Sequence, residues 1–407
     1  MIYKSTGYIF LTKENKVKYK SAAAVVLFSW LVLTTPVWST PSANELQRFF
    51  DNRIPELMRK YHVAGTVVGV TNAEDTLFQK GYGQANIEDG LAVDAEKTLF
   101  RPGSIAKLFT WTAIMQLEEA EQLKLTDPVE KYLDFQLPGA YTEPIRIIDL
   151  MNHTPGFEDR LIGLMLIDPK YYRTLKAAVR NDIPRRVRPP GEASSYSNYG
   201  TMLAGYIVQR LTGVPYEQYV QEKILEPLGM RHSTMVQPPE QALSMQAVHM
   251  AQAYSHADGK YRREPFEYIN GAPAGALTAS CPDMLRFYRA YLNEGSNENG
   301  TVLQPATVRE MRNTSFRFDP RANGMAHGFM EMGTQNTPVL GHGGDTIYFH
   351  SMSGYLPTEG WAYFISTNSA SGSSLIYALH QEMLNEFLPM PDGKVLSAEA
   401  EADPNLQ

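Results

Sequence analysis

The amino-acid sequence predicts a mixed α/β fold in which two β-rich ends of the chain enclose a helical middle. Extended segments occur at residues 66–71, 76–82, 348–356 and 361–367, whereas residues 125–264 carry mostly helical patterns between loops rich in Pro and Gly. No repeat of about 20–50 residues is present, which argues against a solenoid or a propeller. The sequence therefore predicts one discontinuous α/β domain built from both ends of the chain, with an all-α insertion between them.

Helical patterns flank and interrupt the β-rich segments. Residues 43–61 carry apolar side chains near helical spacing, although Pro55 weakens the middle of this pattern. The strongest pattern covers residues 104–123, where apolar residues recur on one face. Further helices are predicted at residues 145–152, 199–212, 216–228, 280–292 and 374–387.

The chain is expected to form one folded unit between two segments of different composition. An N-terminal segment precedes this unit and a polar tail follows it, whereas the unit itself combines the α/β part with the helical insertion. The expected boundaries are 1–39 for the N-terminal segment, 40–390 for the folded unit, about 44–135 and 265–390 for its α/β part, about 136–264 for its insertion and 391–407 for the tail.

The N-terminal segment has the order of a secretory signal. Four lysines between positions 13 and 20 precede an apolar run at residues 22–33, and small residues follow up to position 39. The run is shorter than the roughly 18 residues of a membrane span, so we expect a cleaved signal peptide, with an uncleaved signal anchor as the alternative. The sequence thus predicts an exported protein, periplasmic or extracellular, that meets a membrane only if this segment is retained.

Composition excludes several classes of protein. The 407 residues carry a formal net charge of −7, with 43% hydrophobic and 20% charged residues, so the chain is neither disordered nor of low complexity. The acidic balance argues against a nucleic-acid partner, because neutralising phosphates needs clustered Lys and Arg. Cys281 is the single cysteine, which excludes an internal disulfide and a Cys-based metal site. The sequence also lacks the His-Glu-x-x-His motif of metalloproteases and the Gly-x-Ser-x-Gly elbow of α/β-hydrolases.

A candidate nucleophile opens the strongest helical pattern, in the segment from Ser104 to Lys107. Residues i and i+3 lie on one face of a helical turn, so the Ser104 hydroxyl and the Lys107 amine can approach each other. A serine hydroxyl is a weak nucleophile without a base, and a desolvated lysine can be neutral enough to serve as that base. Backbone N–H groups at the helix N-terminus would favour an oxyanion. Alone, the pattern also fits a helix-capping serine beside a solvated lysine.

Two further segments carry polar side chains in patterns that suit catalysis. Tyr196 and Asn198 precede a predicted helix, where the phenol can act as general acid or base and the amide can hold a substrate carbonyl. The alternative is a turn in which Asn198 caps the helix. His342, Gly344 and Asp345 enter the second β-rich region, where glycines would let a substrate backbone approach a strand closely. The alternative is a glycine-rich turn.

These three segments occur in the order Ser-x-x-Lys, Tyr-x-Asn and His-x-Gly, which is the pattern of serine β-lactamases and penicillin-binding proteins. From about residue 45 to residue 387 the chain resembles the class C β-lactamase-related family of serine hydrolases. Residues 150–157 and 226–230 also resemble segments of that family, and His153 is expected to anchor a loop there. The resemblance implies a β-lactamase/transpeptidase-like fold, with an antiparallel sheet flanked by helices and an all-α subdomain.

The resemblance implies an acyl-enzyme mechanism that needs no metal or cofactor. Ser104 would be the nucleophile and Lys107 its partner base. Tyr196 would help to activate Ser104 and would protonate the leaving group. Water would then hydrolyse the acyl-enzyme.

The resemblance also implies the residues that bind substrate. Asn198 would bind the acyl side chain of the substrate, and His342 would lie on the strand that edges the site, where Gly344 permits close approach. The backbone N–H groups of Ser104 and Asp345 would form the oxyanion hole. The substrate would be a small molecule or a short peptide, which could derive from the cell wall.

The third motif departs from the family pattern. Class C β-lactamases usually carry Lys-Thr-Gly there, and this chain has His342, Gly343 and Gly344. Gly343 offers no hydroxyl, and His342 is expected to be only partly charged near neutrality, so a substrate carboxylate loses two partners. The departure weakens the prediction of an efficient β-lactamase or a strict carboxypeptidase. It leaves esterase, amidase or D-amino-acid peptidase activity open. Penicillin-binding protein, D-Ala-D-Ala carboxypeptidase or weak β-lactamase activity is the first alternative, and a non-catalytic cell-wall-binding scaffold is the second.

Overall fold

The computed structural model describes residues 40–139, 141–334 and 337–388. The predicted signal segment and the polar tail at residues 391–407 lie outside the described residues. Within the described part, no helix combines the length and the apolar character that a membrane span requires.

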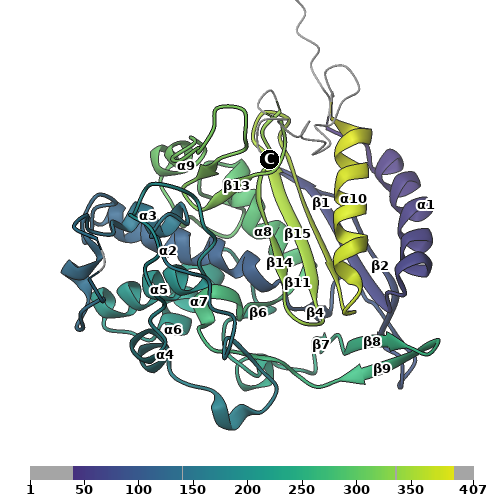
Figure 1. Cartoon of the computed structure of the whole chain (residues 1–407). Coiled ribbons are helices and arrows are strands. Elements are labelled where there is room, and N and C mark those ends of the chain that lie inside the picture. The colour runs from purple at the N-terminus through teal and green to yellow at the C-terminus, as the bar shows by residue number, and fades with distance from the viewer. Residues whose placement is uncertain (1–39, 140, 335–336, 389–407) are drawn as a thin grey trace, which may run out of the picture. The chain divides into compact units, whose positions relative to one another are not determined.

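An eight-stranded antiparallel sheet forms the centre of the described chain, and it takes strands from both ends of the sequence (Figure 1). Its order is β12-β13-β14-β15-β16-β1-β2-β3. The strands are β1 (Gly65–Asn72), β2 (Thr76–Asn86), β3 (Leu91–Ala92), β12 (Met325–Ala326), β13 (Phe329–Glu331), β14 (Leu340–Asp345), β15 (His350–Leu356) and β16 (Trp361–Thr367). The two ends of the chain meet where β1 pairs with β16, in a register that sets Val68 opposite Ile365.

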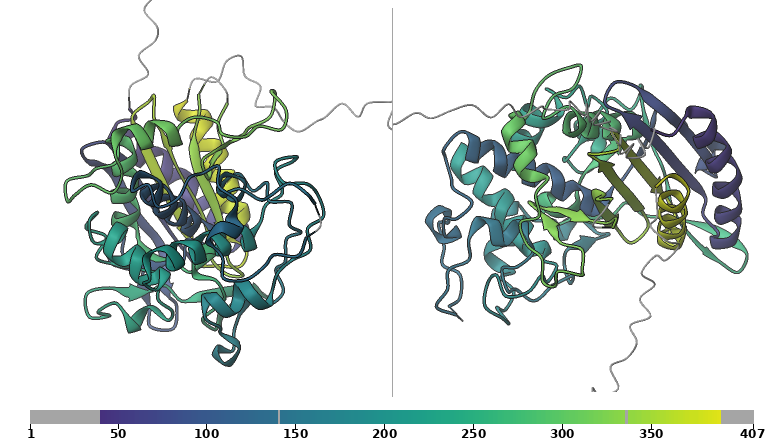
Figure 2. Two further views of the ribbon diagram at one scale, coloured as in Figure 1. Left: turned by 90° about the vertical axis from the view of Figure 1, so that its left-hand side faces the viewer. Right: turned by 90° about the horizontal axis from the view of Figure 1, so that it is seen from above.

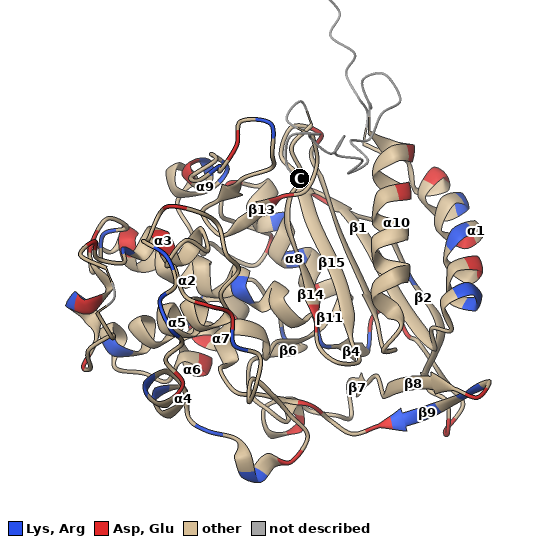
Figure 3. Ribbon diagram, in the orientation of Figure 1, with Lys and Arg blue, Asp and Glu red and all other residues tan. Residues whose placement is uncertain are grey.

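Helices cover both faces of this sheet. Helices α1 (Ala43–Tyr61) and α10 (Gly372–Phe387) lie side by side on one face, and α8 (Cys281–Leu292) packs against the other (Figures 1 and 2). Every residue of β15 and β16 is buried, because a strand covered on both faces has no solvent-facing side. Lys, Arg, Asp and Glu instead gather on the outer helices and loops, and the central strands carry almost none (Figure 3).

Helix α1 remains a single helix although Pro55 lies within it. A proline inside a helix removes a backbone hydrogen bond and costs about 3 kcal/mol. Four side chains of α1, from Leu46, Phe50, Ile54 and Leu57, are buried against the sheet and α10, which offsets this cost. A capping box formed by Ser42 and Glu45 closes the start of the helix.

The other helices lie mainly on the opposite side of the sheet from α1 (Figure 1). They are α2 (Lys107–Glu119), α3 (Ile147–Met151), α4 (Leu175–Asn181), α5 (Asn198–Thr212), α6 (Tyr216–Val220), α7 (Ala272–Gly275) and α9 (Pro305–Met311). A 3₁₀ turn, η1 (Gly103–Ala106), precedes α2, so the segment predicted as one helix from residue 104 begins with a tighter turn. Ten residues of α2 are buried, which makes it a core helix and not an amphipathic one.

Strands also occur in residues 136–264, where the sequence pattern predicts helices alone. They are β5 (Met165–Leu166), β6 (Ser233–Thr234), β7 (His249–Met250), β8 (Ala253–Ala257) and β9 (Lys260–Glu264). The β8–β9 hairpin turns at Asp258 and Gly259, which both have positive φ. Asp-Gly is a strong hairpin signal, and the expectation of an all-α insertion overlooked it. The region is therefore mixed in secondary structure.

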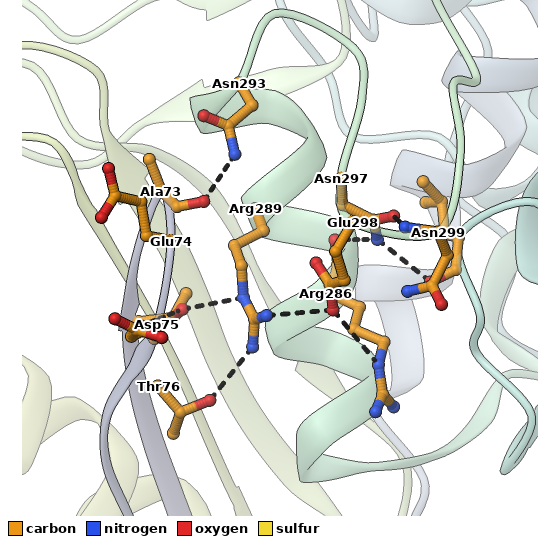
Figure 4. Close-up of polar contacts among 12 residues, drawn as sticks. Ala73, Glu74, Asp75, Thr76, Arg286, Arg289, Asn293, Asn297, Glu298 and Asn299 are labelled. Atoms are coloured by element: carbon orange, nitrogen blue, oxygen red, sulfur yellow. Dashed lines mark hydrogen bonds and ion pairs between the residues drawn. The ribbon is translucent and has the colours of Figure 1, made fainter.

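Arg289 of α8 joins three segments on one side of the sheet (Figure 4). Its guanidinium donates to Thr71 Oγ1 at 3.1 Å and to Thr76 Oγ1 at 3.0 Å, at the two ends of the β1–β2 turn. It also donates to Glu298 Oε1 at 3.0 Å, in the loop that follows α8. The Arg289 side chain is only 12% exposed, although Glu298 and Thr76 at the far ends of two of these bonds are exposed.

The Arg289→Ala variant should therefore lower the free energy of unfolding by about 1 kcal/mol, because it removes one part-buried and two exposed hydrogen bonds. Urea titration followed by circular dichroism measures the change. Arg262→Ala is the matched control, since Arg262 is 59% exposed and its ion-pair partner in the described chain is the exposed Asp258. The control should change the same quantity by less than about 0.5 kcal/mol. Equal effects of the two substitutions would contradict the bridging role.

Candidate active site

Ser104 and Lys107 stand together at the junction between η1 and α2. Lys107 Nζ donates to Ser104 Oγ at 2.9 Å. Residues i and i+3 nearly eclipse each other in a 3₁₀ turn, which aligns the two side chains more directly than an α-helical turn does. Ser104 remains partly exposed, whereas Lys107 is fully buried. A reacting group can therefore reach the hydroxyl from solvent, but water is excluded from the amine.

The buried Lys107 amine has two more partners. It donates to Asn198 Oδ1 at 2.8 Å and to the backbone oxygen of Ala274 at 2.6 Å. Burial lowers the pKa of Lys107 to about 7, and the nearby charge of Asp159 partly opposes this shift. A neutral amine has two N–H groups and one lone pair. With Asn198 and Ala274 accepting the two hydrogens, the lone pair is left to accept the proton of Ser104.

The Ala274 carbonyl could not be identified from the sequence, because it is a backbone atom. It belongs to α7, which has only four residues. The carbonyls of so short a helix largely lack intrahelical partners, and that of Ala274 is free to accept from Lys107. No side-chain pattern signals such a contact.

Tyr196 lies beside the same amine. Lys107 Nζ is 4.9 Å from the centre of the Tyr196 ring, and that ring lies 4.4 Å from the ring of His153 and 6.0 Å from the ring of His342. Burial raises the pKa of Tyr196, while its hydrogen bond with Ser104 acts in the opposite direction. The phenol is therefore protonated near neutrality and can donate.

His153 fixes the loop that carries Tyr196, as the sequence analysis expects. Its Nδ1 accepts from the backbone N–H of Ser197 at 3.2 Å, and its carbonyl accepts from that of Ser195 at 2.7 Å. Both neighbours of Tyr196 are thus tied to one residue. Ser197 caps α5, so Asn198 is the first residue of the helix and its amide is free to face Lys107.

His342 lies on β14 and is 2% exposed. Burial, and next the charge of Lys107, lowers the pKa of His342 to about 3. The expectation that His342 is partly charged near neutrality was therefore wrong, because a buried imidazole beside an amine loses its proton readily. Its Nε2 has no hydrogen-bond partner among the described residues. The ring therefore carries no positive charge near neutrality.

Gly344 lets β14 run directly against the nucleophile segment. A Cβ placed on Gly344 would lie 1.8 Å from the carbonyl oxygen of Pro102 and 3.0 Å from the backbone nitrogen of Ser104. On the facing side, a Cβ on Gly103 would lie 2.8 Å from the backbone nitrogen of Asp345. The two residues expected to form the oxyanion hole, Ser104 and Asp345, are therefore close neighbours because both intervening glycines lack side chains.

Glu267 and Arg101 tie together the two segments that meet at this point, and neither residue is a predicted site residue. Arg101 lies three residues before Ser104, and its buried guanidinium donates to the backbone carbonyl of Glu267. The Glu267 carboxylate accepts from Thr346 Oγ1 at 2.7 Å and from the backbone N–H of Ile347 at 2.6 Å. These bonds hold the turn that follows Asp345. An isolated Glu in a loop gives no sequence signal for this position.

Metal ligands do not cluster in the described part of the chain. No group of three or more His, Cys, Asp or Glu side chains there could hold a metal ion. The arrangement instead offers a serine hydroxyl, a neutral amine, a phenol and two neighbouring backbone N–H groups, which are the parts that acyl transfer requires.

Comparison with known proteins finds penicillin-binding proteins and an amidase among the similar chains. Penicillin-binding protein 4 of Amycolatopsis lactamdurans is 27% identical over 372 residues, which cover 87% of this chain and 94% of that protein. The octameric penicillin-binding protein homologue from Pyrococcus abyssi superposes with a TM-score of 0.70 at 25% identity, covering 83% of this chain and 77% of that chain. D-amino acid amidase from Ochrobactrum anthropi SV3 shares the fold, with a TM-score of 0.69 at 23% identity and coverage of 84% and 97%.

These structural likenesses confirm the predicted β-lactamase/transpeptidase-like fold, in which helices flank an antiparallel sheet. The family model described as Beta-lactamase matches residues 50–383, and the three motifs that carry the sequence resemblance all lie within these bounds. The chain therefore belongs to the beta-lactamase family of serine hydrolases.

Proposed function

We propose that this protein hydrolyses ester or amide bonds through an acyl-enzyme on Ser104. The observation that carries the proposal is the environment of Lys107, whose amine lies 2.9 Å from Ser104 Oγ and has a pKa lowered to about 7. A base of this pKa is half neutral at pH 7, which is close to the optimum for proton transfer at that pH.

The proposed reaction begins when neutral Lys107 accepts the Ser104 proton and Oγ attacks the substrate carbonyl. The negative oxygen of the tetrahedral intermediate is stabilised by the backbone N–H groups of Ser104 and Asp345. Tyr196 donates its proton to the leaving group and recovers one from Lys107. Water then attacks the acyl-enzyme. The same groups take the proton of this water and return a proton to Ser104 Oγ, which releases the free enzyme.

The third motif favours substrates without a carboxylate next to the scissile bond. His342 is neutral at pH 7, and Gly343 has no hydroxyl, so this strand presents neither the charge nor the donor that a β-lactam or peptide carboxylate would use. We therefore propose esterase or amidase activity, including D-amino-acid peptidase activity, ahead of β-lactamase activity.

A penicillin-binding protein that acylates and barely turns over is the second candidate. It is favoured by the 27% identity to penicillin-binding protein 4 over most of both chains. A scaffold without catalysis is disfavoured, because the contact between Ser104 and Lys107 is intact. We also propose export, on the basis of the signal-like order of residues 1–39. Cell-wall peptides would then be accessible substrates.

The Ser104→Ala variant should lose at least about 1,000-fold in kcat for a short acyl ester, because the acyl-enzyme cannot form. Its melting temperature should change little, since Ser104 is partly exposed and packs no core. Mass spectrometry of the wild-type protein after treatment with a fluorophosphonate should find the adduct on Ser104. Ser244→Ala, at an exposed serine, is the control and should remain active.

The same mass measurement with a penicillin distinguishes the two candidates. A penicilloyl adduct that persists for hours would favour the penicillin-binding protein, and a rapidly lost adduct or none would favour the hydrolase. Continued hydrolysis by Ser104→Ala would contradict the mechanism itself.

Activity should rise with pH through about 7, because only neutral Lys107 can accept the Ser104 proton. For a substrate that does not titrate, log(kcat/KM) should increase with a slope near one below about pH 6.5 and level off above about pH 8. His342, with a pKa near 3, should add no step in this range. A flat profile between about pH 5 and pH 9 would contradict the base role of Lys107.

The Gly344→Ala variant should reduce kcat by about 100-fold or more, because its methyl group would push β14 away from Pro102 and disturb the oxyanion hole. Steady-state kinetics together with a thermal melt separate this effect from unfolding. Gly139→Ala is the control, since a Cβ there would meet no atom within 4 Å. Unchanged kcat in Gly344→Ala would contradict the proposed placement of the oxyanion.

A further inference from the structure

Asp159 places a carboxylate beside the site, and the reaction proposed above does not use it. The residue follows α3 in a loop and is exposed. Its Oδ1 accepts from Asn198 Nδ2 at 3.3 Å. Its charge also acts on Lys107 and Tyr196, so the carboxylate is within electrostatic range of both. Within the part of the chain that the structure describes, Asp159 takes part in no ion pair.

Asn198 connects this carboxylate to the reacting groups. Its Oδ1 accepts from Lys107 at 2.8 Å, while one of its two Nδ2 hydrogens is directed at Asp159. If the acyl carbon of a substrate lies over Ser104, the group on the neighbouring α-carbon lies beside Asn198, the residue expected to bind the acyl part. That group would therefore also be close to Asp159.

Lys107 bonds the Oδ1 side of Asn198 and Asp159 bonds its Nδ2 side, so a positive group is favoured only on the side of Asp159. The next residue, Arg160, has its guanidinium 4.0 Å from Asp182, a carboxylate that also pairs with Arg173. Glu158, on the other side, accepts from the backbone N–H of Arg185 at 3.4 Å. His342 contributes no charge near neutrality. The Asp159 carboxylate, which is in no ion pair among the described residues, can accept a charge-assisted hydrogen bond from an ammonium group.

We propose that Asp159 is a specificity-determining residue that binds the free α-ammonium group of an aminoacyl ester or amide substrate. The inference rests on the proposed acyl-enzyme at Ser104, because that bond places the α-carbon beside Asn198. It narrows the substrate from esters and amides in general to those of amino acids with an unblocked amino group.

The test compares pairs of substrates that differ only at this amine. The substrates are the D and L enantiomers of alanyl and phenylalanyl p-nitroanilide, each with the amine free and with the amine acetylated. Hydrolysis by the full chain is measured at pH 7. The free amine is mostly protonated at this pH. The wild-type protein should show a higher kcat/KM for the free-amine member of the preferred pair.

In Asp159→Asn the ratio of kcat/KM for the free amine to that for the acetylated amine should fall by roughly 2- to 5-fold, since an amide cannot neutralise the ammonium group and the carboxylate is exposed. The acetylated substrate should be cleaved at nearly the wild-type rate, which a merely structural loss would not allow. Glu158→Gln makes the same change of charge at the adjacent residue and should leave the ratio unchanged.

Three results would overturn the inference. The first is an equal loss for both substrates in Asp159→Asn, which would assign the carboxylate to the support of Lys107 and Asn198. The second is an unchanged ratio. The third is a failure of the wild-type protein to prefer the free amine. It would be seen either as faster cleavage of the acetylated substrate, or as no cleavage of either anilide while a fluorophosphonate still labels Ser104. Absence of labelling at Ser104 in folded protein would instead overturn the proposed hydrolase function, and this inference with it.

Discussion

The burial of the Lys107 amino group is the constraint on which the other parts of the site depend. An amine without water must find its hydrogen-bond partners in the protein, and here they are Ser104 Oγ, Asn198 Oδ1 and the Ala274 carbonyl. These atoms belong to η1, α5 and α7, so three elements must pack around one nitrogen. The same packing that excludes water also lowers the pKa of Lys107 towards neutrality. The packing that stabilises this region therefore also makes Lys107 a suitable base.

The parts of the molecule that could be predicted from the sequence are those set by residues close together in the chain. The period of the apolar residues located α1, β1 and β16 within a few positions, and the Ser-x-x-Lys spacing brought Ser104 and Lys107 together as expected. The π-helical turn at Gln221–Leu225, which interrupts a helix predicted at residues 216–228, has no such signature. The β8–β9 hairpin did have one, in Asp258 and Gly259, which the helical interpretation of the region overlooked.

The contacts that could not be predicted join distant segments or use backbone atoms. Glu267 and Asp159 act on residues far away in the sequence, and neither lies in a motif that names its partner. The charge state of His342 was misjudged for a related reason, because it depends on burial and on an amine brought near by folding. A sequence shows which side chains are available, whereas their protonation is a property of the folded surroundings.

The pairing of β1 with β16 has a consequence for the order in which the molecule can assemble. These strands come from opposite ends of the described chain, and β14, which borders the nucleophile, also belongs to the C-terminal part. Contacts between residues so distant in sequence form only after the intervening chain is available, which makes folding slow. A polypeptide that stops short of β14 therefore carries its serine and lysine without the strand that completes the oxyanion hole. The set of groups proposed for catalysis is therefore complete only after β14 has joined the sheet.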